Sequence, residues 1–292
     1  MLVLKGSMVA MATPFKNGAL DEAAFATHAR FLVDNGTSVL VPMGTTGESV
    51  TCSDAEQARA VRIAVENKGR AIVLGGAGSN DTAHAIHLVK GVRDAGADGT
   101  LVVTPYYNRP TQDGLVAHYK AIAKAHPGFP IVAYNVPSRT GVDLLPETCA
   151  RLCEIPEVVG LKEATGNMAR TVDIFEKCGD RLQLISGDDF TIAPFIACGG
   201  LGVISVSANI APRQVADLCD AALAGKREAA RDLQTRLNPL HRALFSEASP
   251  TPVKAGLSLM GRFTDEIRLP LLPMTEGPKA KLREAMKQLG IL

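Results

Sequence analysis

Short apolar runs alternate with amphipathic stretches along the first three quarters of the chain. The stretches between the runs have apolar residues at helical spacing, and some open with helix-start signals, such as Ser53 and Glu56 at capping-box spacing and Pro146 in a first turn. The apolar runs are bounded by glycine, proline or polar residues, which is typical of buried strands. They predict strands at 7–14, 38–44, 71–78, 99–105, 131–137, 158–164, 182–189 and 202–208.

Strands that are apolar throughout are typical of parallel sheets covered on both faces. Strand–helix units repeated eight times in about 220 residues favour a closed (β/α)8 TIM barrel over an open doubly wound sheet. From about residue 225 there is no strand-like run, and three helix-like segments separated by proline and glycine follow. We therefore expect a catalytic barrel at 1–224 and a small C-terminal helical domain at 225–292.

Composition and charge limit the kinds of molecule that the protein is expected to bind. The 292 residues are 46% hydrophobic, and 31 Lys and Arg against 30 Asp and Glu leave a net charge of +1. No basic field is available to bind nucleic acid or an anionic membrane. The opening segment lacks the features of a secretory leader, and no apolar run is long enough to span a membrane. We expect a cytoplasmic enzyme acting on small molecules.

The cysteines and histidines do not predict a metal site. None of the six cysteines forms a C-x-x-C pair, which favours free thiols in a reducing compartment over a disulfide framework or a zinc site. His84 and His87 are three residues apart in a helix-like stretch, but no further ligand completes a set around them. We expect neither a metal nor a cofactor.

In a barrel of this type the reacting groups lie at the carboxyl ends of the strands and in the loops that follow. Polar and aromatic residues of this chain gather at those points, so they should meet at one mouth. They are Lys162, Ile204 and the segments "GTTGE" (44–48), "PYYNRP" (105–110), "YNVPSRTG" (134–141) and "GDD" (187–189).

Lys162 ends an apolar strand and should enter the barrel. An amine that leaves water loses hydration of its charged form, and a neutral amine is a nucleophile toward carbonyls. The alternative is an ion pair with Glu163 that only closes the barrel. Adjacent strand residues face opposite sides, so Glu163 should point away from Lys162.

Schiff-base chemistry also needs a proton shuttle. Tyr134 lies on the neighbouring strand at a comparable depth, and Thr45 and Tyr107 could align further hydroxyls with it. Alternatively, Tyr134 is a core aromatic residue with a backbone partner, and "GTTGE" is only a turn.

The motifs together resemble the pyruvate-dependent Schiff-base aldolase superfamily, and within it the dihydrodipicolinate synthase (4-hydroxy-tetrahydrodipicolinate synthase) family. The resemblance spans nearly the whole chain in order. It implies condensation of pyruvate with L-aspartate 4-semialdehyde through a lysine Schiff base, the first committed step of lysine and diaminopimelate biosynthesis. The segments that carry it are "GTTGES", "TPYYNRP", "YNVPSRTG", "GLKEATG", "SGDD" and "GVISV".

The resemblance also implies roles for catalytic residues. Lys162 would form the Schiff base, and Tyr134 would donate and accept protons through Thr45 and Tyr107. In the family this last tyrosine comes from the neighbouring subunit. The resemblance therefore implies a homo-oligomer, most simply a tetramer built from tight dimers.

Substrate contacts follow from the same resemblance. Thr46, with backbone groups near Gly187 and Ile204, would hold the pyruvate carboxylate, and Arg139 would bind the carboxylate of the semialdehyde. A planar guanidinium suits two-point recognition of a carboxylate, although a loop arginine can also be only solvated.

Many members of the family bind L-lysine as an inhibitor in a cleft at the dimer interface. This chain departs from lysine-sensitive members at His84, where they carry a glutamate. Imidazole cannot pair with the ammonium of lysine as a carboxylate does, although Asp54 could compensate in part. We expect weak or absent inhibition. The matching positions are Ser49, Val50, Asn80, His84 and Tyr106.

Three other functions are alternatives to the synthase. A sister pyruvate aldolase acting on a sugar acid or on 4-hydroxy-2-oxoglutarate would share Lys162 and Tyr134, whereas Arg139 and "TPYYNRP" resemble the synthase form. A phosphate-binding barrel would rest on "GGAGSND" (75–81), which lacks the lysine and the glycine spacing of phosphate-binding motifs. A catalytically silent regulatory barrel is improbable with a complete set of reacting groups.

Overall fold

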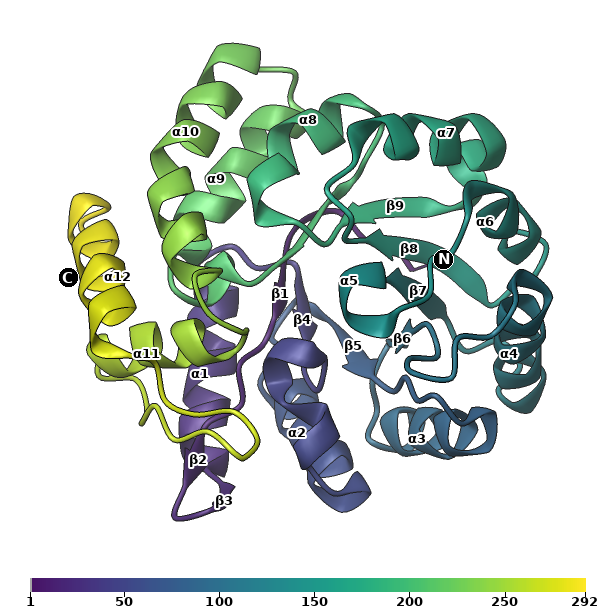
Figure 1. The fold of residues 1–292 in the computed structure, drawn as a ribbon, viewed down its shortest axis with the longest axis horizontal. Coiled ribbons are helices and arrows are strands. Elements are labelled where there is room, and N and C mark those ends of the chain that lie inside the picture. The colour runs from purple at the N-terminus through teal and green to yellow at the C-terminus, as the bar shows by residue number, and fades with distance from the viewer. Residues whose placement is uncertain (1) are drawn as a thin grey trace.

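The computed structural model describes residues 2–292. Eight parallel strands close into a barrel in the order β1-β10-β9-β8-β7-β6-β5-β4, with helices around it (Figure 1). The predicted (β/α)8 barrel is confirmed. The strands are β1 Gly6–Ala10, β4 Val39–Val41, β5 Ile72–Gly76, β6 Gly99–Val103, β7 Ile131–Asn135, β8 Val158–Glu163, β9 Gln183–Ser186 and β10 Gly202–Ser205.

Each observed strand lies within or overlaps its predicted run, but most are shorter. The run at 182–189, for example, pairs only over β9, because Asp189 already begins a 3₁₀ turn, Asp189–Thr191. A short hairpin of β2 (Phe15–Lys16) and β3 (Ala19–Leu20) was not predicted from the sequence. Asn17 and Gly18 between them have φ of 55° and 81°, which suits an Asn-Gly hairpin turn.

The helices begin where the sequence signals indicate. In α2 the Ser53 hydroxyl accepts from the Glu56 N–H at 3.2 Å and the Glu56 carboxylate accepts from the Ser53 N–H at 2.9 Å. The helices are α1 Glu22–Asp34, α2 Asp54–Glu66, α3 Thr82–Asp94, α4 Gln112–Ala125, α5 Pro137–Thr140, α6 Pro146–Leu152, α7 Met168–Cys178, α8 Ile192–Ala197, α9 Pro212–Leu223, α10 Arg227–Leu244, α11 Thr251–Leu259 and α12 Glu276–Gln288.

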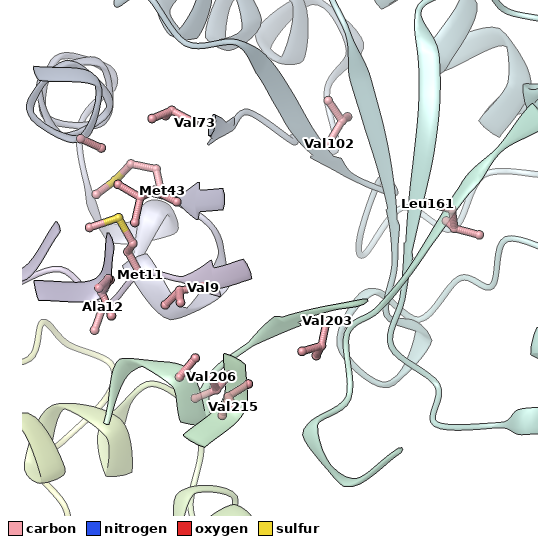
Figure 2. Close-up of a cluster of buried hydrophobic side chains, with 14 of the residues drawn as sticks. Val9, Met11, Ala12, Met43, Val73, Val102, Leu161, Val203, Val206 and Val215 are labelled. Atoms are coloured by element: carbon pink, nitrogen blue, oxygen red, sulfur yellow. The ribbon is translucent and has the colours of Figure 1, made fainter. Parts of the chain in front are cut away.

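Alternation along the strands divides the buried side chains into two layers. One layer lies between the strands and the helices, and Figure 2 shows Val9, Val73, Val102, Leu161 and Val203 of five strands within it. The other layer fills the barrel and includes Met8, Leu74, Leu101, Tyr134, Ile185 and Ile204. Strand residues next to a member of the outer layer therefore point into the barrel.

The last three helices, α10 to α12, lie together at one side of the barrel, where α10 packs beside α9 (Figure 1). Their buried residues, such as Leu237 and Leu282, belong to the same hydrophobic cluster as the outer faces of the strands. We retain residues 225–292 as a proposed C-terminal helical domain that shares its core with the barrel. In the part of the chain from 2 to 292, no helix combines the length and hydropathy of a membrane span.

Candidate active site

Lys162 and Tyr134 are neighbours inside the barrel. The two residues are paired in the register of β7 and β8, and Lys162 follows Leu161 of the outer layer, so its side chain points inward. Its amine lies 4.3 Å from the centre of the Tyr134 ring. Lys162 is only 6% exposed, and no carboxylate within residues 2–292 forms an ion pair with it. A buried amine without an ion-pair partner is unusual and indicates a catalytic role.

Glu163 lies on the opposite face of β8, as predicted. Its carboxylate accepts hydrogen bonds from Arg170 Nε and Asn135 Nδ2, both at 3.0 Å, and from the Thr165 N–H at 2.8 Å. This network lies behind the strand and involves no group of Lys162. The alternative in which Lys162 only neutralises Glu163 is therefore wrong.

The strand next to β8 makes room for the lysine. A Cβ on Gly187 would lie 3.0 Å from Lys162 Cε and 2.6 Å from the Ala164 Cβ, so any side chain there would displace the lysine. Ile204 is fully buried in the same inner layer as Tyr134. Gly187 and Ile204 thus come from the two strand ends on one side of Lys162, and β7 lies on the other.

A cavity of about 690 Å³ opens at the strand ends beside Tyr134. Of the predicted catalytic and substrate residues, Thr45, Tyr107, Tyr134 and Arg139 line it. Lys162, Thr46, Gly187 and Ile204 do not line the cavity, but the Lys162 amine lies 4.3 Å from the centre of the Tyr134 ring, which does. Tyr134 therefore connects the buried lysine with the cavity.

The hydroxyls of the predicted relay are near the cavity but are not joined. Within residues 2–292, Thr45, Tyr107 and Tyr134 form no hydrogen bonds with one another. The Tyr107 side chain is 88% exposed, and its backbone is left-handed with φ of 72°. A bulky residue rarely adopts that conformation without a functional reason.

Arg139 lies in the short helix α5, directly after β7. Its guanidinium has no ion-pair partner in the described chain, so it is free to bind an anion at the cavity. Arg109, which the sequence did not single out, also lines the cavity and donates to the Gly141 carbonyl at 3.1 Å. Its place in "TPYYNRP", directly after the end of β6, is the signal that could have identified it.

Comparison with known proteins decides the family. The model of the dihydrodipicolinate synthetase family matches residues 3–289. The chain belongs to this family. A curated 4-hydroxy-tetrahydrodipicolinate synthase from Geotalea uraniireducens is 50% identical over 291 residues, which are 99% of this chain and all of the relative.

Solved structures of the family have the same fold. Dihydrodipicolinate synthase from Acinetobacter baumannii, solved with pyruvate, is 41% identical with a TM-score of 0.97 over 99% of this chain and 100% of that one. A monomeric dihydrodipicolinate synthase variant is 42% identical with a TM-score of 0.96 over 99% of this chain and 97% of that one. The family therefore includes a variant that is monomeric.

The five residues matched to the family's lysine cleft are divided in this structure. Ser49, Val50 and Tyr106 line the same cavity as Tyr134, whereas Asn80 and His84 lie outside it. The Nε2 atom of His84 is 3.2 Å from Asp54 Oδ1.

His87 shares the same carboxylate, with its Nε2 atom 3.5 Å from Asp54 Oδ2. Within residues 2–292, no group of three or more side chains is arranged to hold a metal ion. Asp54 therefore lies beside His84, but two imidazoles already contact its oxygens, and it does not line the cavity that contains Ser49, Val50 and Tyr106.

Proposed function

We propose that the protein condenses pyruvate with L-aspartate 4-semialdehyde, with Lys162 as the Schiff-base residue. The observation that carries the proposal is the buried, unpaired Lys162 amine beside Tyr134, in a chain 50% identical over its length to a 4-hydroxy-tetrahydrodipicolinate synthase. The reaction would be the first committed step of lysine and diaminopimelate biosynthesis.

The chemistry requires an amine and a proton shuttle. The Lys162 amine adds to the keto carbon of pyruvate, and loss of water from the carbinolamine gives an imine. Removal of a methyl proton gives an enamine, whose terminal carbon attacks the aldehyde carbon of the second substrate. The Tyr134 ring lies 4.3 Å from the amine, and its hydroxyl would move protons in these steps.

The charged groups at the cavity suit substrates that are anions. Arg139 and Arg109 line the outer cavity, where the second substrate would bring its carboxylate. Deeper in the barrel, Thr46 and the backbone near Gly187 and Ile204 would hold the carboxylate of pyruvate. This division would place the pyruvate close to the lysine and the semialdehyde nearer to solvent.

We also propose that the active protein is a homo-oligomer, with a tetramer of tight dimers as the arrangement implied by the family resemblance. The exposed, left-handed Tyr107 supports this assembly, because a second subunit would cover its ring and align its hydroxyl with Thr45. A monomeric variant exists in the family, so the assembly needs its own test.

A substrate assay tests the function. The purified protein should consume pyruvate only when L-aspartate 4-semialdehyde is present, and it should cleave 4-hydroxy-2-oxoglutarate far more slowly. Faster cleavage of that acid, or of a 2-keto-3-deoxy sugar acid, would identify a sister aldolase instead.

Arg139→Ala separates recognition of the second substrate from imine formation. Losing a charge-assisted contact costs about 1.5 to 3 kcal/mol, so KM for the semialdehyde should rise about 10- to 100-fold while the pyruvate imine still forms. Arg151→Ala is the matched control, since Arg151 pairs with Asp113 on the outside of the barrel. Equal damage to both steps would mean that Arg139 only holds the loop together.

A further inference from the structure

A buried ion pair links the C-terminal helices to the loop that follows β4. Lys254 of α11 donates to Glu48 at 2.5 Å, and the two side chains are 1% and 2% exposed. The partners are 206 residues apart in the sequence. Burial lowers the pKa of Lys254, and the Glu48 carboxylate opposes that shift.

The same carboxylate is held from a second side. The Arg268 N–H donates to the other Glu48 oxygen at 3.1 Å, and the Arg268 guanidinium donates to the Thr51 carbonyl at 2.8 Å. The Phe15 ring lies 4.3 Å from the Lys254 amine and 4.1 Å from the Arg268 guanidinium. The Lys254 amine and the Arg268 backbone N–H therefore hold the Glu48 carboxylate from two sides, and the Arg268 guanidinium holds the chain just after it.

Glu48 is directly connected to the predicted reacting residues. Thr45–Gly47 form one 3₁₀ turn, and the Glu48 N–H closes it by donating to the Thr45 carbonyl at 3.1 Å. Gly47 is also fixed, because its carbonyl accepts from the Thr13 hydroxyl at 2.8 Å. A shift of Glu48 would therefore move Thr45 and Thr46.

The turn is also a strained segment that needs support. Met43 and Glu48, which flank it, both have φ of 56°, a left-handed conformation that is unfavourable for these residues. Gly76 allows the turn to lie close to β5, since a Cβ there would be 2.0 Å from the Met43 carbonyl oxygen. Strained backbone persists only where its surroundings hold it in place.

We propose that the Lys254–Glu48 pair is a positioning device that sets Thr45 and Thr46 for catalysis from the C-terminal helices. The inference rests on the proposed function, because it assigns the pair to the pyruvate-binding and proton-transfer steps. A hydrophobic pair could fill the same space without a desolvation cost, so stability alone is a weak reason for two buried charges. A charged pair, in contrast, fixes direction and distance.

The experiment uses a charge-neutral double variant, Glu48→Gln with Lys254→Met. Removing both charges avoids leaving one buried and unpaired, and glutamine can still accept from the Arg268 N–H. The readouts are urea unfolding, kcat, KM for pyruvate, and the yield of the borohydride-reduced pyruvate adduct. The matched control is Asp265→Asn with Lys279→Met, an ion pair at 3.2 Å within the C-terminal region that does not contact the loop.

A positioning role predicts a folded double variant with kcat reduced at least ~10-fold, KM for pyruvate raised and adduct yield lowered, while the control stays within about twofold of the wild type. A cooperatively folded double variant with wild-type kcat and KM would overturn the inference. If the double variant does not fold, Glu48→Asp serves instead, because it keeps the charge but shortens its reach, and an unchanged kcat there would be equally decisive.

The wild-type protein separates this inference from the proposed function. A wild type that forms no adduct at Lys162 would overturn both. A wild type that forms the adduct, together with an unaffected double variant, would overturn the positioning role alone.

Discussion

At the scale of single residues, the site depends on one amine that has no partner. The strand neighbours of Lys162 in the inner layer, Tyr134 and Ile185, are aromatic and apolar, and the nearby acid, Glu163, is bound to Arg170 on the other face of β8. Such surroundings leave the amine available to a carbonyl substrate. Burial without a partner, rather than the presence of a lysine, is what distinguishes Lys162.

Tyr134→Phe should leave the fold intact and reduce kcat by ~10²- to 10⁴-fold, the usual effect of losing a positioned proton-transfer group. The phenyl ring still fills the inner layer, so the unfolding midpoint in urea should hardly change. Tyr119→Phe is a control that removes another buried hydroxyl, which donates to the Val102 carbonyl at 2.9 Å. Neither Tyr119 nor Val102 lines the cavity. Near-normal turnover in Tyr134→Phe would exclude that residue from proton transfer.

Inhibition by L-lysine is expected to be weak or absent, because the Asp54 oxygens are already in contact with His84 and His87. The ammonium of lysine would lose water without gaining a free carboxylate. Synthase activity should be measured at saturating pyruvate from micromolar to millimolar lysine, with His84→Glu as a gain-of-sensitivity control. Strong submillimolar inhibition of the wild type would show that Asp54 has replaced the missing acid.

At the scale of elements, the loops after β7 and β8 are held by one buried ionic network. Arg170 of α7 donates to Glu163 at 3.0 Å and to Asp143 at 3.1 Å, and its side chain is 10% exposed. Arg170→Met would leave the Glu163 carboxylate buried without its cation, and breaking such a pair typically costs about 3 to 5 kcal/mol.

The test compares the free energy of unfolding in urea for Arg170→Met and for Lys90→Met. Lys90 pairs with Asp94 at an exposed site, where solvent screens the charges and an ion pair contributes little to stability. A loss in Arg170→Met no larger than that control would mean that the network contributes little to stability.

The sequence predicts the strands of the barrel well, but it does not predict the contacts between distant elements. The periodicity of the apolar residues was sufficient to predict eight strands. The alternation of side chains along a strand was sufficient to predict that Lys162 and Glu163 point to opposite faces. The anchoring of Glu48 could not be predicted, because its partner Lys254 is 206 residues away and lies in a helix that reads as an ordinary amphipathic segment. The left-handed backbone conformation of Tyr107 could not be predicted either, since that conformation is usual only for residues such as glycine and asparagine.

At the scale of the whole molecule, the proposed proton relay is not joined by hydrogen bonds within a single chain over residues 2–292. Tyr107 lines the cavity but extends into solvent, and it has no hydrogen bond to Thr45 within the described residues. A second copy of the chain that covers this loop would bury the ring and bring its hydroxyl to the relay. The active unit should then be no smaller than a dimer.

Complementation between two inactive variants tests this sharing. Tyr107→Phe and Tyr134→Phe should each be nearly inactive alone, but a co-expressed mixture should recover ~25% of wild-type activity, because mixed dimers contain one intact site. A mixture that stays inactive, or a fully active monomer in sedimentation, would place Tyr107 and Tyr134 of each site on the same chain or exclude Tyr107 from the relay.

Lys162 should form the imine with pyruvate, and trapping that imine is the decisive experiment. The protein is incubated with pyruvate, reduced with borohydride, digested and analysed by peptide mass, with Lys90→Met and Lys162→Met proteins treated in parallel; Lys90 is an exposed lysine away from the cavity. We expect one reduced pyruvyl group on the peptide that contains Lys162, retained in Lys90→Met and absent from Lys162→Met. An unmodified Lys162 peptide, or an adduct on another lysine, would contradict this expectation.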